Sequence, residues 1–203
     1  SVTGVQTCAL PILRPLEAVA TGIIVPHVTS AEEARQIVDW VRFHPLGRRA
    51  MDGGNNDGRY CLTPVNDYIR HANTERVVVL QIESPEAAEQ VETIAAVPGF
   101  DGILFGPGDF SHRIGKPGQI DAPEVVAARK RVAAAARRHG KFAMSAGLIA
   151  PLADLVREGH SVINIGADVL GLATYVKQRL ELIRGEISQL PADLKPTGRS
   201  VYQ

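Results

Sequence analysis

Residues 77–84 read VVVLQIES, an apolar run that ends in a carboxylate and a serine. Such a run is typical of a strand that is buried on both faces, as in a parallel sheet. Ser84 and Pro85 then supply a good N-cap and first helical residue, which predicts a helix directly after the strand. Glu83 is unexpected here, because burying an unpaired carboxylate costs several kcal/mol.

The same pattern of an apolar run followed by helical periodicity recurs along the chain. Strands that alternate with helices are typical of βα units around a parallel sheet, either doubly wound or closed as a (β/α)8 barrel. The predicted strands cover residues 22–28, 77–83, 102–105, 142–146 and 161–165. The predicted helices cover residues 30–43, 85–97, 122–139, 151–158 and 170–189.

A nucleotide motif and the chain length distinguish these two folds. No GxGxxG sequence follows the first predicted strand, which removes the best evidence for a doubly wound dinucleotide fold. A barrel needs eight strands and typically about 250 residues, whereas this chain of 203 residues has five predicted strands. We therefore expect an α/β chain that holds about the last five βα units of a barrel.

The first twelve residues, SVTGVQTCALPI, fit neither a secretory signal nor a helix. Residues 2–12 resemble the in-frame translation of a sequencing-library adapter, so we interpret residues 1–12 as a leader foreign to the fold. We expect the partial barrel to cover residues 13–190, with an irregular tail over 191–203. We also expect about three βα units to be missing ahead of residue 13.

One long stretch, residues 45–76, breaks the rhythm of strands and helices. It contains PLGRRAMDGGNNDGRY, in which Gly and Asn are crowded together. Loops of this length are usually functional or mobile. The alternatives are a plain surface loop and a loop that covers the site or contacts a neighbouring subunit.

Charge and composition narrow the class of function. The chain has 22 Lys and Arg against 22 Asp and Glu, whereas nucleic-acid-binding domains usually carry a basic excess. No run of about 18 apolar residues is present, so the sequence predicts no membrane span. Cys8 and Cys61 are too few for a disulfide framework or a thiolate metal site, which favours a reducing, cytoplasmic setting.

Two acidic residues, Glu83 and Asp109, each follow a predicted strand. In parallel α/β folds the carboxyl ends of the strands meet at the ligand-binding edge. Nearby carboxylates repel each other unless they share a proton or a cation, and their oxygens suit Mg²⁺ or Mn²⁺. The alternative is that Glu83 caps the next helix and Asp109 makes a turn. Gly106 and Gly108 let the backbone come close to a ligand. Successive main-chain N–H groups there can hold the carboxylate of that ligand.

Several segments together resemble the HpcH/HpaI aldolase family, which is related to the citrate lyase β-subunit. These segments are VLQIES, PEAAEQVETIAAVPGFDGILFGPGDFS and GKPGQIDAPEVVAARKRVAAAARRHGK. The similarity covers about residues 16–186, and the spacing of QIE and GPxD is its most specific feature. The resemblance implies a (β/α)8 barrel of the phosphoenolpyruvate/pyruvate type, with Mg²⁺ or Mn²⁺ held by Glu83 and Asp109. It also implies that Gly106, Gly108 and Asp109 bind the carboxylate of a 2-oxo acid.

The resemblance further implies an aldolase, a carbon–carbon lyase. Such an enzyme cleaves or forms 4-hydroxy-2-oxo acids from a pyruvate-type 2-oxo acid and an aldehyde, through a metal-stabilised enolate. A homo-oligomer, a hexamer with exchanged C-terminal helices, is also implied. The alternatives are a citrate-lyase-β or malyl-CoA-type lyase acting on CoA esters, and a non-catalytic assembly module stabilised by a metal. We see no clear basic nucleotide-binding segment for CoA.

Some residues of the family pattern have no counterpart in this chain. The general base, a His oriented by an Asp, and an Arg for the keto oxygen belong to strands that would precede residue 13. We therefore assign these catalytic roles to no residue here and expect this chain by itself to turn over poorly. His27, in VPHV, is expected to pack or to line the pocket. Arg48 and Arg49 are expected to order the long loop or to contact a neighbouring subunit.

Overall fold

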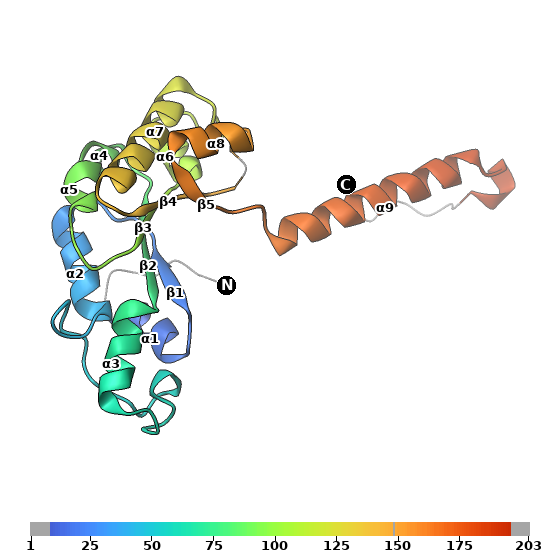
Figure 1. Ribbon diagram of the computed structural model, residues 1–203. Coiled ribbons are helices and arrows are strands. Elements are labelled where there is room, and N and C mark those ends of the chain that lie inside the picture. The colour runs from blue at the N-terminus through green and yellow to red at the C-terminus, as the bar shows by residue number, and fades with distance from the viewer. Residues whose placement is uncertain (1–8, 148, 196–203) are drawn as a thin grey trace. The chain divides into compact units, whose positions relative to one another are not determined.

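The computed structural model describes residues 9–147 and 149–195 (Figure 1). It divides into two compact units, Ser1–Asn164 and Ile165–Gln203. The first unit contains a parallel sheet with its helices. The second unit contains the long helix α9 (Asp168–Gln189).

The five strands of the sheet are all parallel and lie in the order β1-β2-β3-β4-β5. This order follows the chain without reversal, as in a barrel, whereas a doubly wound sheet reverses its order at a switch point. The five predicted strands and the parallel α/β class are therefore confirmed. The strands are β1 (Gly22–Val25), β2 (Val77–Ile82), β3 (Gly102–Phe105), β4 (Phe142–Ser145) and β5 (His160–Ile163).

Helices follow the strands and cover the sheet. Contacts between α2 and α5, and between α5 and α7, form a layer that packs on the strands. Ser30 caps α2 through its hydroxyl, as its capping-box spacing predicts. The helices of the first unit are α1 (Ala9–Glu17), α2 (Ala31–Val41), α3 (Val65–Thr74), α4 (Pro85–Glu89), α5 (Val91–Ala95), α6 (Pro107–Arg113), α7 (Pro123–Arg138) and α8 (Leu152–Glu158).

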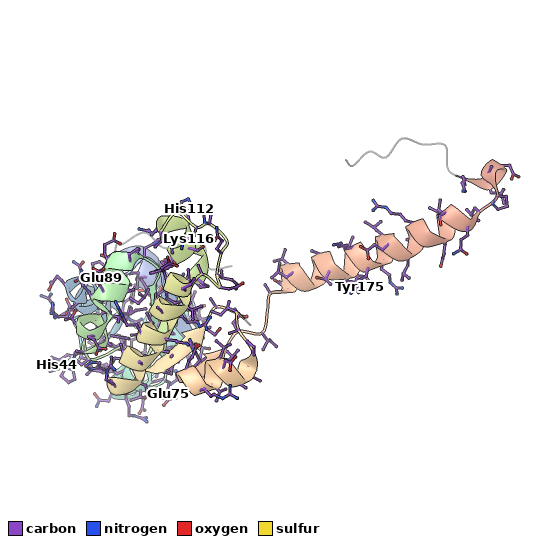
Figure 2. All side chains as sticks on the ribbon, turned by 90° about the horizontal axis from the view of Figure 1, so that it is seen from above. His44, Glu75, Glu89, His112, Lys116 and Tyr175 are labelled. Atoms are coloured by element: carbon purple, nitrogen blue, oxygen red, sulfur yellow. The ribbon has the colours of Figure 1, made fainter. Side chains whose placement is uncertain are left out.

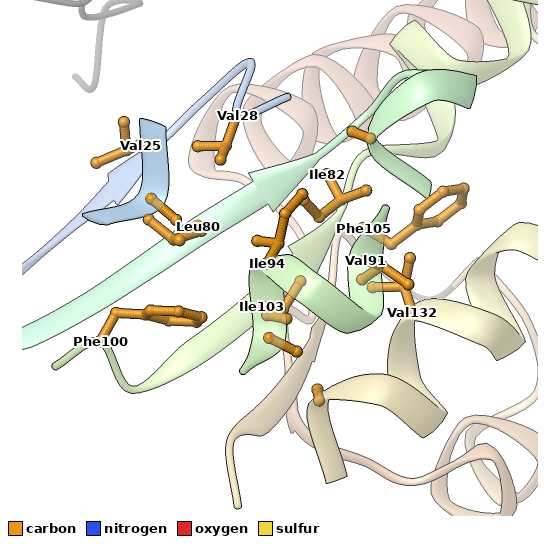
Figure 3. Close-up of a cluster of buried hydrophobic side chains, with 14 of the residues drawn as sticks. Val25, Val28, Leu80, Ile82, Val91, Ile94, Phe100, Ile103, Phe105 and Val132 are labelled. Carbon is orange, nitrogen blue, oxygen red and sulfur yellow. The ribbon is translucent and has the colours of Figure 1, made fainter. Parts of the chain in front are cut away.

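Strand β2 lies at the centre of the hydrophobic core (Figure 3). Its alternating residues Val78, Leu80 and Ile82 are fully buried in one cluster with Ile94 of α5. The side chain of Val79 lies on the opposite face of the strand and is also buried. The run is therefore buried on both faces, as predicted. Each such side chain contributes roughly 1.5–3 kcal/mol by leaving water. This packing holds the strand end before Glu83 in place.

Two helical segments differ from the predicted pattern. The helix predicted over residues 85–97 is interrupted at Gln90, whose backbone (φ −91°, ψ 6°) leaves helical geometry and separates α4 from α5. The prediction of an irregular stretch over residues 45–76 was wrong for α3. Tyr68 and Ala72, four residues apart, are buried on one face of that helix. Burial of such a face stabilises a helix more than local propensity does.

Helix α1 begins inside the leader that we expected to lie outside the fold. Ile12 and Leu16 are buried in the core, and α1 contacts α2. The expectation that no helix forms there was therefore wrong from Ala9 onward, because apolar residues four apart form one buried helical face. Residues 1–8 lie outside the described residues. The adapter origin of the leader and the bounds 13–190 and 191–203 stay predictions.

The loop that precedes α3 lies at the amino ends of the strands. Helix α2 leads back from the carboxyl end of β1, and the short 3₁₀ turn Asn56–Gly58 contacts α1. A hollow of about 660 Å³ beside this turn is also lined by Val19 and Arg76, which precede β1 and β2. Within the first unit, the loop therefore does not cover a site at the carboxyl ends.

Arg49 orders this loop, which was one of the two expectations for it. Its buried guanidinium lies 2.6 Å from the Asp57 carboxylate and stacks near the rings of Phe43 and Tyr68. The Tyr68 hydroxyl donates to Asp57, and burial raises the pKa of Tyr68 to about 12. Arg48, in contrast, is exposed. The two adjacent arginines therefore have different structural roles.

The second unit is described by its long helix. α9 has 22 residues, two of which precede the predicted start, and none of its residues is buried. Its side chains, Tyr175 among them, project on all sides (Figure 2). Val169, Leu172 and Val176 form an exposed apolar strip along it. None of the helices in the described part of the chain is long and apolar enough to cross a membrane.

Candidate functional site

The carboxyl ends of β2 and β3 bring the two predicted acids to one edge of the sheet. Ile82 is paired with Phe105, and the Gly106 N–H donates to the Ile82 carbonyl at 2.9 Å. Glu83 directly follows β2 and is 2% exposed. Asp109 lies in the first turn of α6, directly after β3, and is exposed. The strand ends therefore meet as the sequence predicts.

The Glu83 carboxylate accepts hydrogen bonds from the turn after β1 and from β2 itself. Its Oε1 accepts a hydrogen bond of 2.7 Å from the His27 main-chain N–H, and His27 Nδ1 lies 2.8 Å from the same oxygen. Its Oε2 accepts from the side-chain amide of Gln81. Among the described residues, no Lys or Arg forms an ion pair with Glu83. A buried carboxylate is normally hydrogen-bonded, paired or bound to a metal, and without a Lys or Arg partner this one leaves a divalent cation as a candidate.

Asp109 and the start of α6 add further polar groups to this edge. No described residue forms a hydrogen bond or an ion pair with the Asp109 carboxylate. The Gly108 carbonyl accepts from the Ser111 hydroxyl at 2.7 Å, and that hydroxyl accepts from the Gly118 N–H at 3.1 Å. These bonds connect the first turn of α6 to the loop that follows this helix. The Gly108 and Asp109 amides lie in the first turn, where a helix leaves its N–H groups without partners.

The donor set of this edge fits a hard divalent cation. Within residues 9–147 and 149–195, no group of three or more His, Cys, Asp or Glu side chains is placed to hold a metal ion. Glu83 and Asp109 stay a prediction as the two protein carboxylates of a metal centre. Mg²⁺ is commonly bound through one or two carboxylates, with water and substrate oxygens completing its six positions.

Gly106 is required by the close approach of Glu83. A Cβ atom at this position would lie 2.8 Å from both Cβ and Oε2 of Glu83, and 3.0 Å from Gln81 Nε2. Contacts this short would displace the carboxylate or the turn. The first glycine of GPGD therefore gives room to the acid at the end of the neighbouring strand.

We expect Gly106→Ala to displace the Glu83 carboxylate. The overlap should cost about 1–3 kcal/mol of stability, as overpacking usually does, and should weaken Mn²⁺ binding at least tenfold. Urea unfolding and an Mn²⁺ titration followed by electron paramagnetic resonance measure the two effects. Gly185→Ala is the matched control, since no atom lies within 4 Å of a Cβ at that position. Equal behaviour of the two variants would contradict the steric argument.

Two residues of this site were missed or given a smaller role by the sequence reasoning. Gln81 was not singled out, although it lies two residues before Glu83, so that both side chains are on the same face of the strand. His27 was expected only to pack or to line the pocket. Its backbone has a left-handed φ of 58°, which no sequence pattern in VPHV indicates.

Comparisons with known proteins found one family and several aldolases that are similar to this chain. The family model described as HpcH/HpaI aldolase/citrate lyase matches residues 6–174. The 5-keto-4-deoxy-D-glucarate aldolase of Klebsiella pneumoniae is 34% identical over 173 residues, which are 83% of this chain and 65% of that protein. The pyruvate aldolase of Rhizobium etli is 35% identical over 166 residues, which are 80% of this chain and 63% of that protein. The chain thus spans just under two thirds of these relatives.

A solved structure supports the same assignment. The HpcH/HpaI aldolase of Desulfitobacterium hafniense superposes with a TM-score of 0.80 at 29% identity, covering 92% of this chain and 71% of that one. This likeness confirms the barrel-type α/β fold class that the sequence predicts. The matched segment includes the strand ends that carry Glu83 and Asp109. The chain therefore belongs to the HpcH/HpaI aldolase/citrate lyase family.

Proposed function

We propose that this chain belongs to a divalent-metal-dependent aldolase that acts on pyruvate-type 2-oxo acids. The observation that carries the proposal is Glu83, a buried carboxylate without a Lys or Arg partner among the described residues, beside the strand end that leads to Asp109. The relatives named as aldolases of pyruvate and of keto-deoxy sugar acids support the reaction class. Mg²⁺ or Mn²⁺ is the proposed cofactor, because the two ligands are hard oxygens.

Each residue of the site has a role in this proposal. Glu83 and Asp109 hold the cation, which supplies Lewis-acid stabilisation of the negative charge that develops on a 2-oxo acid. The Gly108 and Asp109 amides bind the substrate carboxylate, and Gly106 leaves room for Glu83. His27 and Gln81 hold the Glu83 oxygens. We assign proton transfer to no residue of this chain.

The proposed partners are a small 2-oxo acid and an aldehyde, which combine to a 4-hydroxy-2-oxo acid. The same family resemblance implies a homo-oligomer. Most of a helix's stability in a protein comes from packing an apolar face, and none of the residues of α9 is buried, so we propose that copies of the chain meet through its exposed apolar strip. A cytoplasmic location stays part of the proposal.

Metal-dependent binding of a planar enolate analogue tests the proposal without requiring turnover. We expect the chain to bind oxalate in the presence of Mn²⁺ and to lose that binding when the metal is removed by a chelator. Isothermal titration with and without Mn²⁺ measures the difference. Oxalate binding that is unchanged by chelation would contradict the proposed site.

Turnover assays separate the remaining alternatives. Pyruvate with aldehydes of increasing size, each with Mn²⁺ or Mg²⁺, tests the aldolase. Oxaloacetate and CoA thioesters test a citrate-lyase-β or malyl-CoA-type lyase. A chain that binds metal and gains stability from it, but converts none of these substrates, would favour the non-catalytic assembly module.

A further inference from the structure

His27 has an unusual backbone conformation at the end of β1. Its φ of 58° lies in the left-handed region, which costs a residue with a side chain roughly 1–2 kcal/mol. Strain of this kind persists where surrounding contacts determine the conformation, and it is concentrated at functional sites. The contacts of His27 therefore indicate what the strained turn does.

Two polar groups of His27, its main-chain N–H and its ring Nδ1, meet the same oxygen atom. The main-chain N–H lies 2.7 Å from Glu83 Oε1, and the ring nitrogen Nδ1 lies 2.8 Å from it. The two residues are 56 positions apart and follow neighbouring parallel strands. An ordinary extended backbone continues the direction of the strand, so the left-handed turn is what brings the amide and the ring to Glu83 together.

The His27 ring lies on the solvent side of this contact. The His27 side chain is 55% exposed, whereas the Glu83 side chain is 2% exposed. Gln81 holds the other oxygen, Oε2, from the strand that carries Glu83 itself. The carboxylate is thus fixed at both oxygens, with one support from β2 and the other from the turn after β1.

We propose that His27 is a positioning residue that fixes the orientation of the Glu83 carboxylate for a divalent cation. This inference rests on the proposed function, since it requires Glu83 to be a ligand. The main-chain N–H sets the position of Oε1, and the ring restricts rotation of the carboxylate and keeps water away from it. Partners that orient a ligand typically affect metal affinity by about 10–100-fold.

Two substitutions separate the ring from the backbone. His27→Gly removes the ring but adopts the left-handed conformation freely, so the main-chain bond to Glu83 remains. His27→Asn also tolerates that conformation and keeps a short side-chain donor. We expect His27→Gly to weaken Mn²⁺ binding by about 10–100-fold and His27→Asn to weaken it less. Without metal, we expect the melting temperature of His27→Gly to equal or exceed that of the wild type.

The experiment is an Mn²⁺ titration followed by electron paramagnetic resonance, with melting curves of the metal-free proteins. His71→Asn is the control, since His71 is an exposed residue of α3, outside the site. Unchanged affinity in His27→Gly overturns the inference, and so does a loss of affinity that only parallels a loss of stability. Glu83→Gln is included as a reference. If the wild type does not bind Mn²⁺, or if Glu83→Gln binds it equally well, the proposed metal site fails and the inference fails with it.

Discussion

Glu83→Gln is expected to weaken Mn²⁺ binding by at least about a hundredfold while the chain stays folded. Changing a residue that only orients a metal ligand typically lowers metal affinity by about 10–100-fold. Changing the ligand itself should lower the affinity at least as much. Gln keeps the size of Glu and can still accept the hydrogen bond from the His27 N–H. It removes the negative charge, which is what the cation requires.

With bound Mn²⁺, Glu83→Gln should be less stable than the wild type. Without metal, it should be equally stable or more stable. In the metal-free chain Glu83 is a buried carboxylate without a Lys or Arg partner among the described residues, and removing a charge from a buried position lowers the cost of burying that side chain. Bound Mn²⁺ at a hundred times its dissociation constant should stabilise the wild type by about 2.7 kcal/mol. Melting curves with and without Mn²⁺ measure both effects.

The control for Glu83 is Glu89→Gln. Glu89 lies on α4, is exposed and projects from the surface (Figure 2), so its substitution should change neither measurement. Equal Mn²⁺ affinity of the wild type and Glu83→Gln would remove Glu83 from the metal site. Glu83→Ala adds a further distinction. Lost binding with an intact fold favours a chemical role, whereas lost folding alone favours a structural role.

Arg42→Met is expected to lower the free energy of unfolding by roughly 3–5 kcal/mol, the usual effect of breaking a buried charged network. The Arg42 side chain is 2% exposed and pairs with Asp101 at 2.7 Å. Its other N–H groups donate to main-chain carbonyls of four residues: Ala72, Asn73, Arg76 and Gly99. Met fills similar space but leaves these acceptors without a donor, which is the costly part of the change.

Arg42 also connects three segments that are far apart in the sequence. It lies just after α2 and joins the end of α3 to the turn before β3. Asp101, its ionic partner, also accepts from the Val78 N–H at 2.7 Å, so the network reaches β2. The substitution should therefore loosen the amino end of the sheet without touching Glu83.

Urea unfolding followed by circular dichroism measures the stability of Arg42→Met. The matched control is Arg48→Met, six residues along the same segment. The Arg48 side chain is 85% exposed and pairs with Asp39. Exposed ion pairs contribute little to stability. If both variants lost the same stability, burial of the Arg42 network would not be what makes it important.

The five strands and the two site carboxylates were predictable from the sequence because they depend on local signals. An apolar run such as residues 77–80 forms a strand wherever it can be buried, and the carboxyl ends of parallel strands meet at one edge. Once the order of strands and helices is known, Glu83 and Asp109 are seen to follow neighbouring strand ends. The QIE and GPxD spacing then gave the family without any coordinates.

The helices that were missed show where local signals end. Residues 65–74 carry few strong helix signals, and α3 is stabilised by burying Tyr68 and Ala72 against the rest of the fold. Helix α1 depends in the same way on the burial of Ile12 and Leu16. Tertiary burial outweighs propensity in such segments, and a single sequence does not reveal which partner will cover them.

The sequence by itself determined the parallel α/β class, the strand ends and the two acids that follow them. Only the tertiary structure decided which groups hold those acids: the His27 turn and the Arg42 network join residues that lie 30 to 59 positions apart. The physical reason is range. Periodicity and capping act over a few residues, whereas a buried carboxylate or guanidinium is satisfied by whichever donors and acceptors the folded chain brings within about 3 Å.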